Sequence, residues 1–581
     1  MFQTLPRNPN MSKKLLTHTP SLTPQDQTHP TKAPFLRRLS QIQINPNVLI
    51  LLVAIYLTVT ANLSFFGKVL DIYPIANNLG FVVSTVGLLF GVIWLVLQLF
   101  TYKPAHKVIL SLMIIIGAIC AYFTDSYGTI FDTNMLVNGL ETDHAEAMDL
   151  FAPAFLIRVL LLGVLPVFIL SQLKIQVLPF KRAALQRVVT LLACLGVLAL
   201  CLLPFGDQYA SFFRQHKQVR YYANPVMPIY STIKLGTDKI DDLRRPKHLI
   251  PHAEDAKLIT PVATNSESNS AGMNPVKPKL MVLVVGETVR SDHIGLNGYS
   301  RDTMPLLAKT KDVYSYKDVS SCGTSTAYSV PCMFSYADRK DYDMDLAPYN
   351  ENVLDTLNKQ GVNVIWRDNN SSSKGVADRV TFEDYKTDKL NPNCDVECRD
   401  IGMLKDFDKI VAKPQNTLLV LHQMGNHGPA YYKRYPKEYE VFKPVCESNE
   451  LSKCDNQSVI NAYDNAIVYT DYFLHNIIET LKPYEQEYDV MMMYVSDHGE
   501  SLGENNIYLH GLPYNIAPKS QKQVPLIVWS PASNNIDNGS ITSLLQKPVS
   551  HDYLTPTLLS YFGISTQEVA DKPTLFKPVA N

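Results

Sequence analysis

The sequence predicts a two-part fold, an α-helical membrane domain of five transmembrane helices followed by an outer α/β sandwich domain. Two observations carry this prediction. Apolar residues of the first third gather in five long runs, whereas from about residue 278 short apolar runs alternate with helical patterns. The chain has 581 residues, which is too long for one ordinary domain. Its 46% hydrophobic and 18% charged residues exclude a fully disordered chain and an ordinary cytosolic enzyme.

The apolar runs are expected to form a transmembrane domain over residues 47–205. Most of them approach the roughly 20 residues that a helix needs to cross a bilayer core. The third and fifth are shorter, and for these two a buried core helix is the alternative. The runs cover residues 48–66, 79–100, 108–123, 153–173 and 188–203.

The loops between these runs predict the orientation. Residues 1–46, read as a disordered cytoplasmic tail, carry six Lys or Arg against one acid, Asp26. The loop between the third and fourth runs has six acids and no Lys or Arg. Basic loops stay inside, so the N-terminus is expected in the cytoplasm and everything after Pro204 outside.

Residues 206–277 are expected to connect the two domains. Residues 212–222 mix aromatic and basic side chains, which suits a helix lying along the membrane surface, with an ordinary amphipathic connector as the alternative. Residues 263–279 are rich in Ser, Asn and Pro without hydrophobic periodicity, which predicts a flexible linker. The outer domain then covers residues 278–581.

Short apolar runs predict the strands of the outer domain, with helices at 458–481 and 551–562. This alternation favours a largely parallel sheet covered on both faces, with polar chemistry at the carboxyl ends of its strands. The predicted strands are 280–285, 362–366, 417–422, 490–495 and 524–530.

Cysteine positions agree with this topology. Cys120, Cys194 and Cys201 lie in the apolar runs, and the other six fall in the outer domain as three close pairs. Six cysteines allow 15 connectivities, but short separations favour the local one. A cysteine-based zinc site is the rival, although no pair has two-residue spacing. Disulfides imply an oxidising compartment such as a bacterial periplasm. The expected pairs are Cys322–Cys332, Cys394–Cys398 and Cys446–Cys454.

Polar groups at the ends of two predicted strands indicate a metal site. Strand 280–285 runs into Glu287, and strand 490–495 runs into Asp497 and His498. Two oxygen ligands and one nitrogen suit Zn²⁺ with a fourth position open. Each residue taken alone is explained better by a helix cap or a surface charge, and only their joint occurrence indicates the metal site.

The segment CGTSTAYSVPC, residues 322–332, resembles a loop and helix start, and it carries Thr324, Ser325 and Thr326. Backbone N–H groups at a helix N-terminus favour an anion such as phosphate. A hydroxyl coordinated to zinc there would have a lowered pKa and become a nucleophile, and simple helix capping is the alternative. Three further groups could neutralise phosphate charge, although each singly reads as a solvated loop residue: Lys374, His427 and His510.

These motifs resemble a known family. Five apolar spans followed by VVGET, CGTSTAYSVPC, DNNSSSKG, GNHGP and SDHGESLGENNIYLHG are similar to the lipid A phosphoethanolamine transferases of Gram-negative bacteria, especially the mobile colistin-resistance members. The resemblance covers all but about the first 40 residues. It implies an outer domain of the alkaline-phosphatase and sulfatase type, located in the periplasm on an inner-membrane anchor. A monomer is expected.

The resemblance also implies roles for individual residues. Thr326 matches the nucleophile that receives phosphoethanolamine. The matching zinc ligands are Glu287, Thr326, Asp497 and His498. The groups matching those that hold phosphoethanolamine or, for the histidines, a second zinc are Asn370, Lys374, His427 and His510. Four-residue spacing would place the matching donor-lipid contacts on one helix face: Asn138, Thr142 and Glu146.

The implied function is zinc-dependent, ping-pong transfer of phosphoethanolamine from phosphatidylethanolamine to a lipid A phosphate. One zinc ion is expected to bind tightly, and whether one or two bind during turnover is left open. Added amines would lower the negative charge of the outer surface and give polymyxin (colistin) resistance.

Three alternatives are weighed against it. A membrane-anchored sulfatase or phosphatase would not need five spans. A phosphoglycerol transferase also uses a zinc-activated threonine but matches the motifs less closely. A sensor or structural membrane protein needs no activated hydroxyl beside a metal. The net charge, one unit negative, argues against a nucleic-acid partner.

Overall fold

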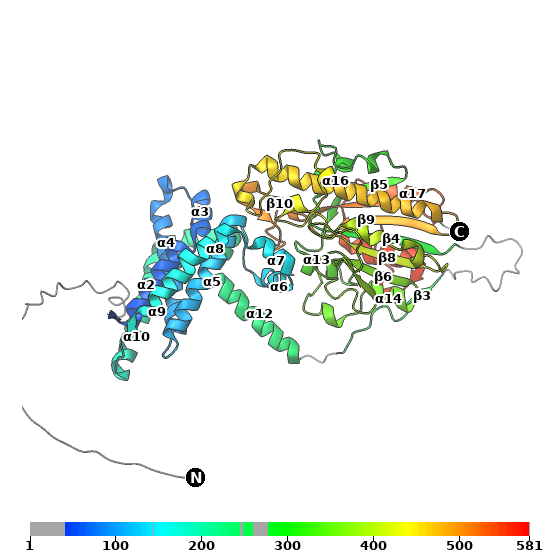
Figure 1. Ribbon diagram of the computed structural model, residues 1–581. Helices are drawn as coiled ribbons and strands as arrows, with labels where there is room; N and C mark the ends of the chain where they lie inside the picture. The colour runs from blue at the N-terminus through cyan, green and yellow to red at the C-terminus, as the bar shows by residue number, and fades with distance from the viewer. Residues whose placement is uncertain (1–40, 143, 245–247, 260–276, 580–581) are drawn as a thin grey trace, which may run out of the picture.

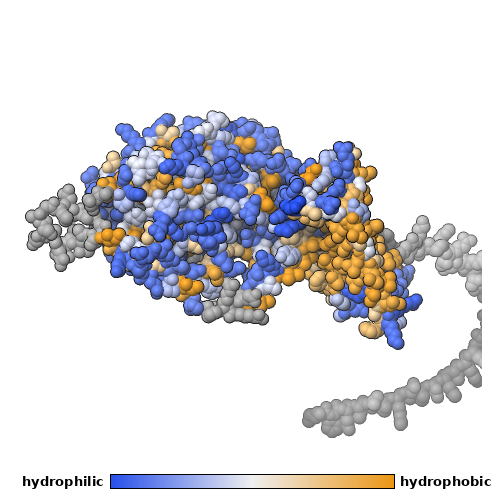
Figure 2. Space-filling model, turned by 180° about the vertical axis from the view of Figure 1, so that it is seen from behind, coloured by the Kyte–Doolittle hydropathy of each residue, from blue (hydrophilic) through white to orange (hydrophobic). Residues whose placement is uncertain are grey.

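The computed structural model describes residues 41–142, 144–244, 248–259 and 277–579. They form a helical domain and a sheet domain side by side (Figure 1). Orange, hydrophobic side chains cover much of the helical domain, whereas the sheet domain is mostly blue (Figure 2). Most of the predicted N-terminal tail and of the predicted flexible linker at 263–279 lies outside the described residues, so both stay predictions, as do the domain boundaries.

Four helices of the helical domain are long and apolar enough to cross a membrane. The third and fifth predicted runs are among them, because each extends beyond its apolar run into a helix of 22 and 36 residues respectively. The four are α4 (Ile75–Phe100), α5 (His106–Tyr127), the continuous stretch Pro153–Gln172 made of α8 (Pro153–Val159), a π-helical turn and α9 (Leu165–Gln172), and Phe180–Gln215, which contains α10 (Phe180–Leu202).

The first predicted span is not one straight helix. It consists of α2 (Pro46–Thr60) and α3 (Leu63–Ile72), which meet at a bend of 58°. Asn62 at the bend is fully buried, and its side chain donates to Leu57 O at 3.0 Å and to Asn224 O at 2.8 Å. It also accepts from Asn224 N at 2.8 Å. A buried amide therefore satisfies the backbone groups that the broken helix leaves unpaired.

The segment after α10 is more helical than predicted. α11 (Gly206–Gln215) and a 3₁₀ turn (Lys217–Tyr222) lead into α12 (Val226–Arg244), a helix that the sequence analysis did not predict. Phe212 is buried, and its ring lies 6.0 Å from that of Phe81 in α4. This segment therefore packs on the helix bundle, while its position relative to a membrane stays a prediction. In Figure 1, α12 runs from the bundle toward the sheet domain.

An eight-stranded sheet forms the centre of the other domain. All five predicted strands are present, and three short or irregularly patterned ones were not predicted: β5 (Val313–Ser320), β7 (Thr381–Asp384) and β13 (Val549–Ser550). All neighbours run parallel except β12 (Gln523–Trp529), which is antiparallel to β5 and β9 (Asp489–Ser496). The order is β13 (Val549–Ser550), β5 (Val313–Ser320), β12 (Gln523–Trp529), β9 (Asp489–Ser496), β4 (Lys279–Gly286), β8 (Thr417–His422), β6 (Asn363–Asp368) and β7 (Thr381–Asp384).

Alternate residues of each strand build a core on each face of the sheet. In β4, Leu280, Val282 and Val284 pack in one cluster with α16 (Asn456–Leu481). Met281, Leu283 and Val285 pack in the other with α14 (Val353–Lys359) and α18 (Leu554–Tyr561). Strands that are buried on both faces read as continuous apolar runs, which is why they were predictable. The polar residues are left at the strand ends.

The six cysteines of the sheet domain form the three expected local disulfides. Cys322 joins Cys332, Cys394 joins Cys398, and Cys446 joins Cys454. Each bridge closes a short loop, so it fixes local geometry more than it restricts the unfolded chain.

Candidate active site

Two neighbouring parallel strands bring the predicted metal ligands together. β4 and β9 pair in register up to Gly286 and Ser496, so Glu287 and Asp497 follow at the same edge of the sheet. The ligand atoms of Glu287, Asp497 and His498 lie within 4.8 Å of one another, and all three side chains are fully buried. The strand register thus places residues that are 210 positions apart in sequence in one cluster.

Of the three candidate hydroxyls, the structure turns one toward this cluster. Thr326 is the first residue of α13 (Thr326–Met333), and its Oγ1 lies 3.0 Å from Glu287 Oε2 and 3.3 Å from His498 Nε2. Thr324 Oγ1 instead donates to Leu512 O at 2.7 Å. Ser325 is the N-cap residue of α13 but makes no side-chain capping bond.

Two buried carboxylates and a buried imidazole set the electrostatics of the cluster. Burial alone would raise the pKa of Glu287, but the hydrogen bond and charge of His498 hold it well below its usual value. Burial and the charge of Glu287 raise the pKa of Asp497 to about 6. Burial would lower the pKa of His498, but Asp497 and Glu287 raise it to about 10. The two carboxylates thus favour positive charge at this point of the site.

The donor atoms fit a zinc ion. Asp497 Oδ1 accepts from the N–H groups of Thr288 at 3.2 Å and of His498 at 2.7 Å. Asp497 Oδ2 is buried without a hydrogen bond and lies 3.4 Å from His498 Nε2. This oxygen lies beside a second carboxylate, an imidazole nitrogen and a hydroxyl. Together these four groups form a donor set that Zn²⁺ accepts.

A strained loop presents Asn370 and Lys374 to the cluster. Asn370 Nδ2 donates to Glu287 Oε2 at 2.8 Å, and Asp368 Oδ1 accepts from Asn370 N at 3.0 Å. Asp368 is itself paired with the buried His422 at 2.9 Å. Ser372 and Lys374 have φ values of 86° and 51°, in the left-handed region that costs non-glycine residues energy. The Asp368–His422 pair beneath the loop therefore supports a conformation that aims Lys374 at the site.

A cavity of about 500 Å³ runs from Thr326 to the helical domain. Its polar end is lined by Thr326, Lys374, His427 and His510, and its apolar part includes Phe123 of α5. Glu141 is the one carboxylate that lines it among the described residues. Further apolar lining comes from the helical domain: Phe131, Met135, Leu136 and Leu235.

Three histidines stand at the polar end. The ring centroids of His498 and His510 are 4.2 Å apart, and those of His427 and His510 are 5.8 Å apart. His510 Nδ1 is 3.1 Å from Glu500 Oε2. Burial lowers the pKa of His427 to about 3, so its ring is neutral.

The predicted single helix face for the donor-lipid contacts is wrong. α6 (Thr133–Glu141) ends at Thr142, whose ψ of 128° is extended, and α7 (His144–Leu150) begins afresh. Asn138 and Thr142 both line the cavity, and Thr142 Oγ1 donates to Asn138 O at 2.8 Å. The side chain of Glu146 lies outside the described residues.

Supporting residues were missed by the sequence analysis. Thr288 donates its hydroxyl to Glu287, and Ser329 Oγ donates to Asp497 O at 2.5 Å. His551 joins Cys322 N and Ser496 O, each at 3.0 Å, and so ties the nucleophile loop to the end of β9. Thr288 stands beside Glu287 in a quoted motif, whereas His551 begins an apolar helix pattern that gives no such signal.

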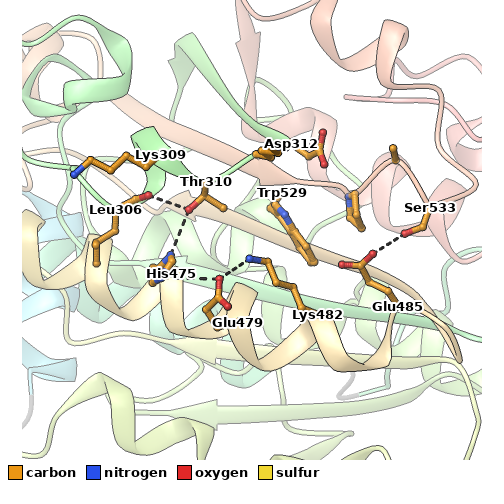
Figure 3. Close-up of a pocket in the computed structure, with 13 residues that line it drawn as sticks. Leu306, Lys309, Thr310, Asp312, His475, Glu479, Lys482, Glu485, Trp529 and Ser533 are labelled. Atoms are coloured by element: carbon orange, nitrogen blue, oxygen red, sulfur yellow. Dashed lines mark hydrogen bonds and ion pairs between the residues drawn. The ribbon is translucent and has the colours of Figure 1, made fainter.

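A cavity of about 660 Å³ elsewhere in the sheet domain contains none of the predicted site residues. It lies beside α16 and the end of β12 (Figure 3). Lys482 Nζ contacts Glu479 Oε1 at 2.5 Å, and Ser533 Oγ donates to Glu485 Oε2 at 2.9 Å. Because this cavity, among the described residues, brings no hydroxyl beside a cluster of metal ligands, we do not place the chemistry there.

Gly499→Ala is expected to damage the site through its backbone. A Cβ at Gly499 would lie 2.0 Å from Ser520 O, so the turn behind His498 would have to shift. We expect a loss of about 1–3 kcal/mol in stability together with weaker metal retention. Thermal unfolding and metal analysis of the purified protein measure both. Gly236→Ala in α12, where a Cβ meets nothing within 4 Å, is the control, and equal behaviour of the two variants would contradict the packing argument.

Comparisons with known proteins agree with this geometry. The sulfatase family model matches residues 279–564, and the model described as phosphoethanolamine transferase EptA/EptB matches residues 89–240. Phosphatidylethanolamine transferase Mcr-1 of Escherichia coli is 47% identical over 92% of this chain and 98% of its own length. Phosphoethanolamine transferase EptA of Escherichia coli K12 is 35% identical over 91% of this chain and 96% of its own.

The likeness extends to a complete solved structure. The integral membrane protein lipooligosaccharide phosphoethanolamine transferase A of Neisseria meningitidis superposes with a TM-score of 0.83 at 33% identity, covering 91% of this chain and 97% of that one. The resemblance and the fold class predicted from the sequence are confirmed. The chain belongs to the phosphoethanolamine transferase family, as a member of the Mcr type.

Proposed function

We propose that the chain transfers phosphoethanolamine from phosphatidylethanolamine to a lipid A phosphate through an intermediate on Thr326, and thereby gives colistin resistance. The observation that carries the proposal is the position of Thr326 Oγ1. It lies against the Glu287 and His498 donor atoms at the end of a cavity that the helical domain helps to line. A soluble substrate would not need a cavity that is lined in part by the helical domain.

The cavity suits the donor lipid at both ends. Phe123 and its apolar neighbours offer a surface for the glycerol and the start of the acyl chains. Lys374 offers positive charge for the phosphate. Glu141 offers a carboxylate for the ammonium group, and its Oε2 lies 3.8 Å from Lys374 Nζ. Lys374 and Glu141 thus place a positive and a negative charge side by side. This arrangement matches phosphoethanolamine, in which two carbons separate the negative phosphate from the positive ammonium.

The chemistry proceeds in two displacements. The Oγ1–P bond forms as the P–O bond to diacylglycerol breaks, and the departing glycerol oxygen takes up the proton that the Thr326 hydroxyl loses. Glu287, whose low pKa keeps it ionised, accepts the hydrogen of the Thr326 hydroxyl and orients its oxygen. A zinc ion held by Glu287, Thr326, Asp497 and His498 would supply Lewis-acid stabilisation of negative oxygen. A lipid A phosphate oxygen then attacks the phosphorus, and Thr326 leaves.

The proposal includes location. An inner-membrane position with the N-terminus in the cytoplasm and the sheet domain in the periplasm follows from the loop charges, and the disulfides suit an oxidising compartment. Both substrates are lipids, so an anchored monomer meets them at the membrane surface.

Mass spectrometry of lipid A from a host with and without the chain tests the activity. A gain equal to phosphoethanolamine is expected, together with a higher polymyxin threshold. A gain equal to phosphoglycerol, or unchanged lipid A beside release of free phosphate or sulfate, would establish one of the enzyme alternatives instead.

Glu141→Gln is expected to raise the donor KM about threefold to tenfold with little change in kcat. The variant keeps the size of the side chain but loses the charge for the ammonium, and the 43% exposure of the Glu141 side chain keeps the effect modest. Steady-state rates with a fluorescent phosphatidylethanolamine analogue measure it. The exposed Glu438→Gln is the control, and an unchanged KM in Glu141→Gln would remove Glu141 from the donor site.

A further inference from the structure

We propose that docking of the helical domain sets the position of His427 through Arg434. In this arrangement Arg434 is a positioning residue, and Asp149 is the helical-domain residue that engages it. The inference rests on the proposed function, since His427 lines the cavity beside Thr326. It makes the active site complete only when the two domains are in contact.

Asp149, near the end of α7, is held by the sheet domain from three directions. Lys433 Nζ contacts its Oδ1 at 2.5 Å, and Arg434 Nη2 contacts its Oδ2 at 3.3 Å. Asn449 Nδ2 donates to its backbone oxygen at 2.6 Å. The Asp149 side chain is 13% exposed and that of Arg434 is 3% exposed. The contact is therefore shielded from water, unlike the surface ion pairs that stabilise proteins little.

The same guanidinium reaches the active-site loop. Arg434 Nε donates to His427 O at 2.6 Å, while its Nη groups face Asp149 and Glu397. A guanidinium is planar, and its donors form a rigid fork. A change at Nη2 therefore also turns Nε. Because Nε is bonded to His427 O, the backbone of His427 shifts, and its ring shifts with it.

Two disulfide loops support the two flanks of this contact. Glu397 lies inside the Cys394–Cys398 loop, and Arg399 Nη1 donates to Lys433 O at 2.6 Å. Asn449 lies inside the Cys446–Cys454 loop. Tyr127 OH, at the end of α5, donates to Asn449 O at 3.0 Å. Two bridges that lie far from Thr326 in sequence thus stiffen the surface on which the helical domain docks.

Without the Asp149 carboxylate, Arg434 keeps its ion pair with Glu397 but loses the one with Asp149. The guanidinium would then turn toward Glu397, and the bond from Nε to His427 O would lengthen. The side-chain contacts among Thr326, Glu287 and His498 involve none of these residues, so zinc content should stay near that of wild type. The expected defect is in turnover, because the neutral His427 ring is misplaced relative to the phosphorus.

The test uses the full-length protein in lipid nanodiscs, with a fluorescent phosphatidylethanolamine analogue as donor. Arg434→Lys is expected to lower kcat about tenfold and Asp149→Asn about threefold to tenfold, since small misplacements near a reacting group are costly. Donor KM and zinc content should stay within twofold of wild type. The double variant should be no slower than Arg434→Lys, because both changes break one chain of contacts.

Lys437→Gln, three positions after Arg434 with a side chain 70% exposed, is the matched control and should keep wild-type rates. Wild-type kcat in Asp149→Asn, effects that multiply in the double variant, or a loss that appears only in KM would overturn the inference. Should Arg434→Lys fail to fold, Asp149→Asn decides alone.

Hydrogen exchange separates failure of this inference from failure of the proposed function. Amides of residues 424–428 should exchange faster in Asp149→Asn than in wild type, whether or not the chain transfers phosphoethanolamine. Unchanged exchange would overturn the coupling even if lipid A is modified as proposed.

Discussion

Thr326→Ala is expected to leave lipid A unmodified, with kcat reduced on the order of 10⁴-fold or more, as when a nucleophile is removed from other enzymes. Thr326 Oγ1 is the candidate hydroxyl that contacts the Glu287 and His498 donor atoms, and Thr324 Oγ1 donates to Leu512 O instead. The alanine removes the γ-methyl group and the hydroxyl, and with the hydroxyl the hydrogen bond to Glu287. The fold should persist, because Thr326 is not the N-cap residue of α13 and its hydroxyl bonds only side chains of the site.

Two measurements separate the covalent mechanism from direct transfer. With a donor analogue and no acceptor, peptide mapping should find the added phosphoethanolamine on Thr326. Thr326→Ser, the matched conservative variant, keeps the oxygen but loses the methyl group that restricts χ1, so we expect slower transfer that is still detectable. Label on Thr324 or Ser325 would move the nucleophile, and undiminished transfer in Thr326→Ala would sink the covalent intermediate.

Removal of the metal, or of one of its carboxylates, is expected to have the second largest effect. Asp497→Asn keeps the shape of the side chain but replaces a carboxylate oxygen by an amide, and Glu287→Gln does the same on the other side. Residues that merely support metal ligands cost about 10- to 100-fold when they are changed, so loss of a ligand should exceed 100-fold. Zinc content should fall in parallel.

Metal analysis and rescue make this prediction decisive. Chelation should inactivate the wild-type protein, and added Zn²⁺ should restore it. Asp537→Asn, at an exposed N-cap of α17 (Asn538–Thr542) remote from the cluster, should change neither zinc content nor rate. Full transfer by a metal-free preparation would falsify the zinc assignment.

Residues next to buried strands were predictable because a strand buried on both faces leaves an unbroken apolar run. The runs ending before Glu287 and before Asp497 gave the two strands, and parallel pairing placed these carboxylates at one edge. The bend at Asn62 was not predictable, since a single amide inside an apolar span carries no sign of its distant partner Asn224.

Contacts between distant segments were beyond the reach of local pattern. Asp149 and Arg434 are 285 positions apart, and neither residue stands in a motif. Glu141 was one acid among six in its loop, and only the structure shows that its side chain lines the cavity. The break at Thr142 likewise depends on how α6 packs beside α12 and α13 rather than on helix propensity alone.

Both domains line the substrate cavity, and this matters for inhibitor discovery. A compound screened against an isolated sheet domain would meet Thr326, Lys374 and the histidines, but not Phe123, Met135 or Leu235. Such a screen selects small polar binders that compete poorly with a lipid. Amphiphilic compounds with an apolar arm long enough to reach α5 would use both halves of the wall, and full-length protein is the target that reveals them.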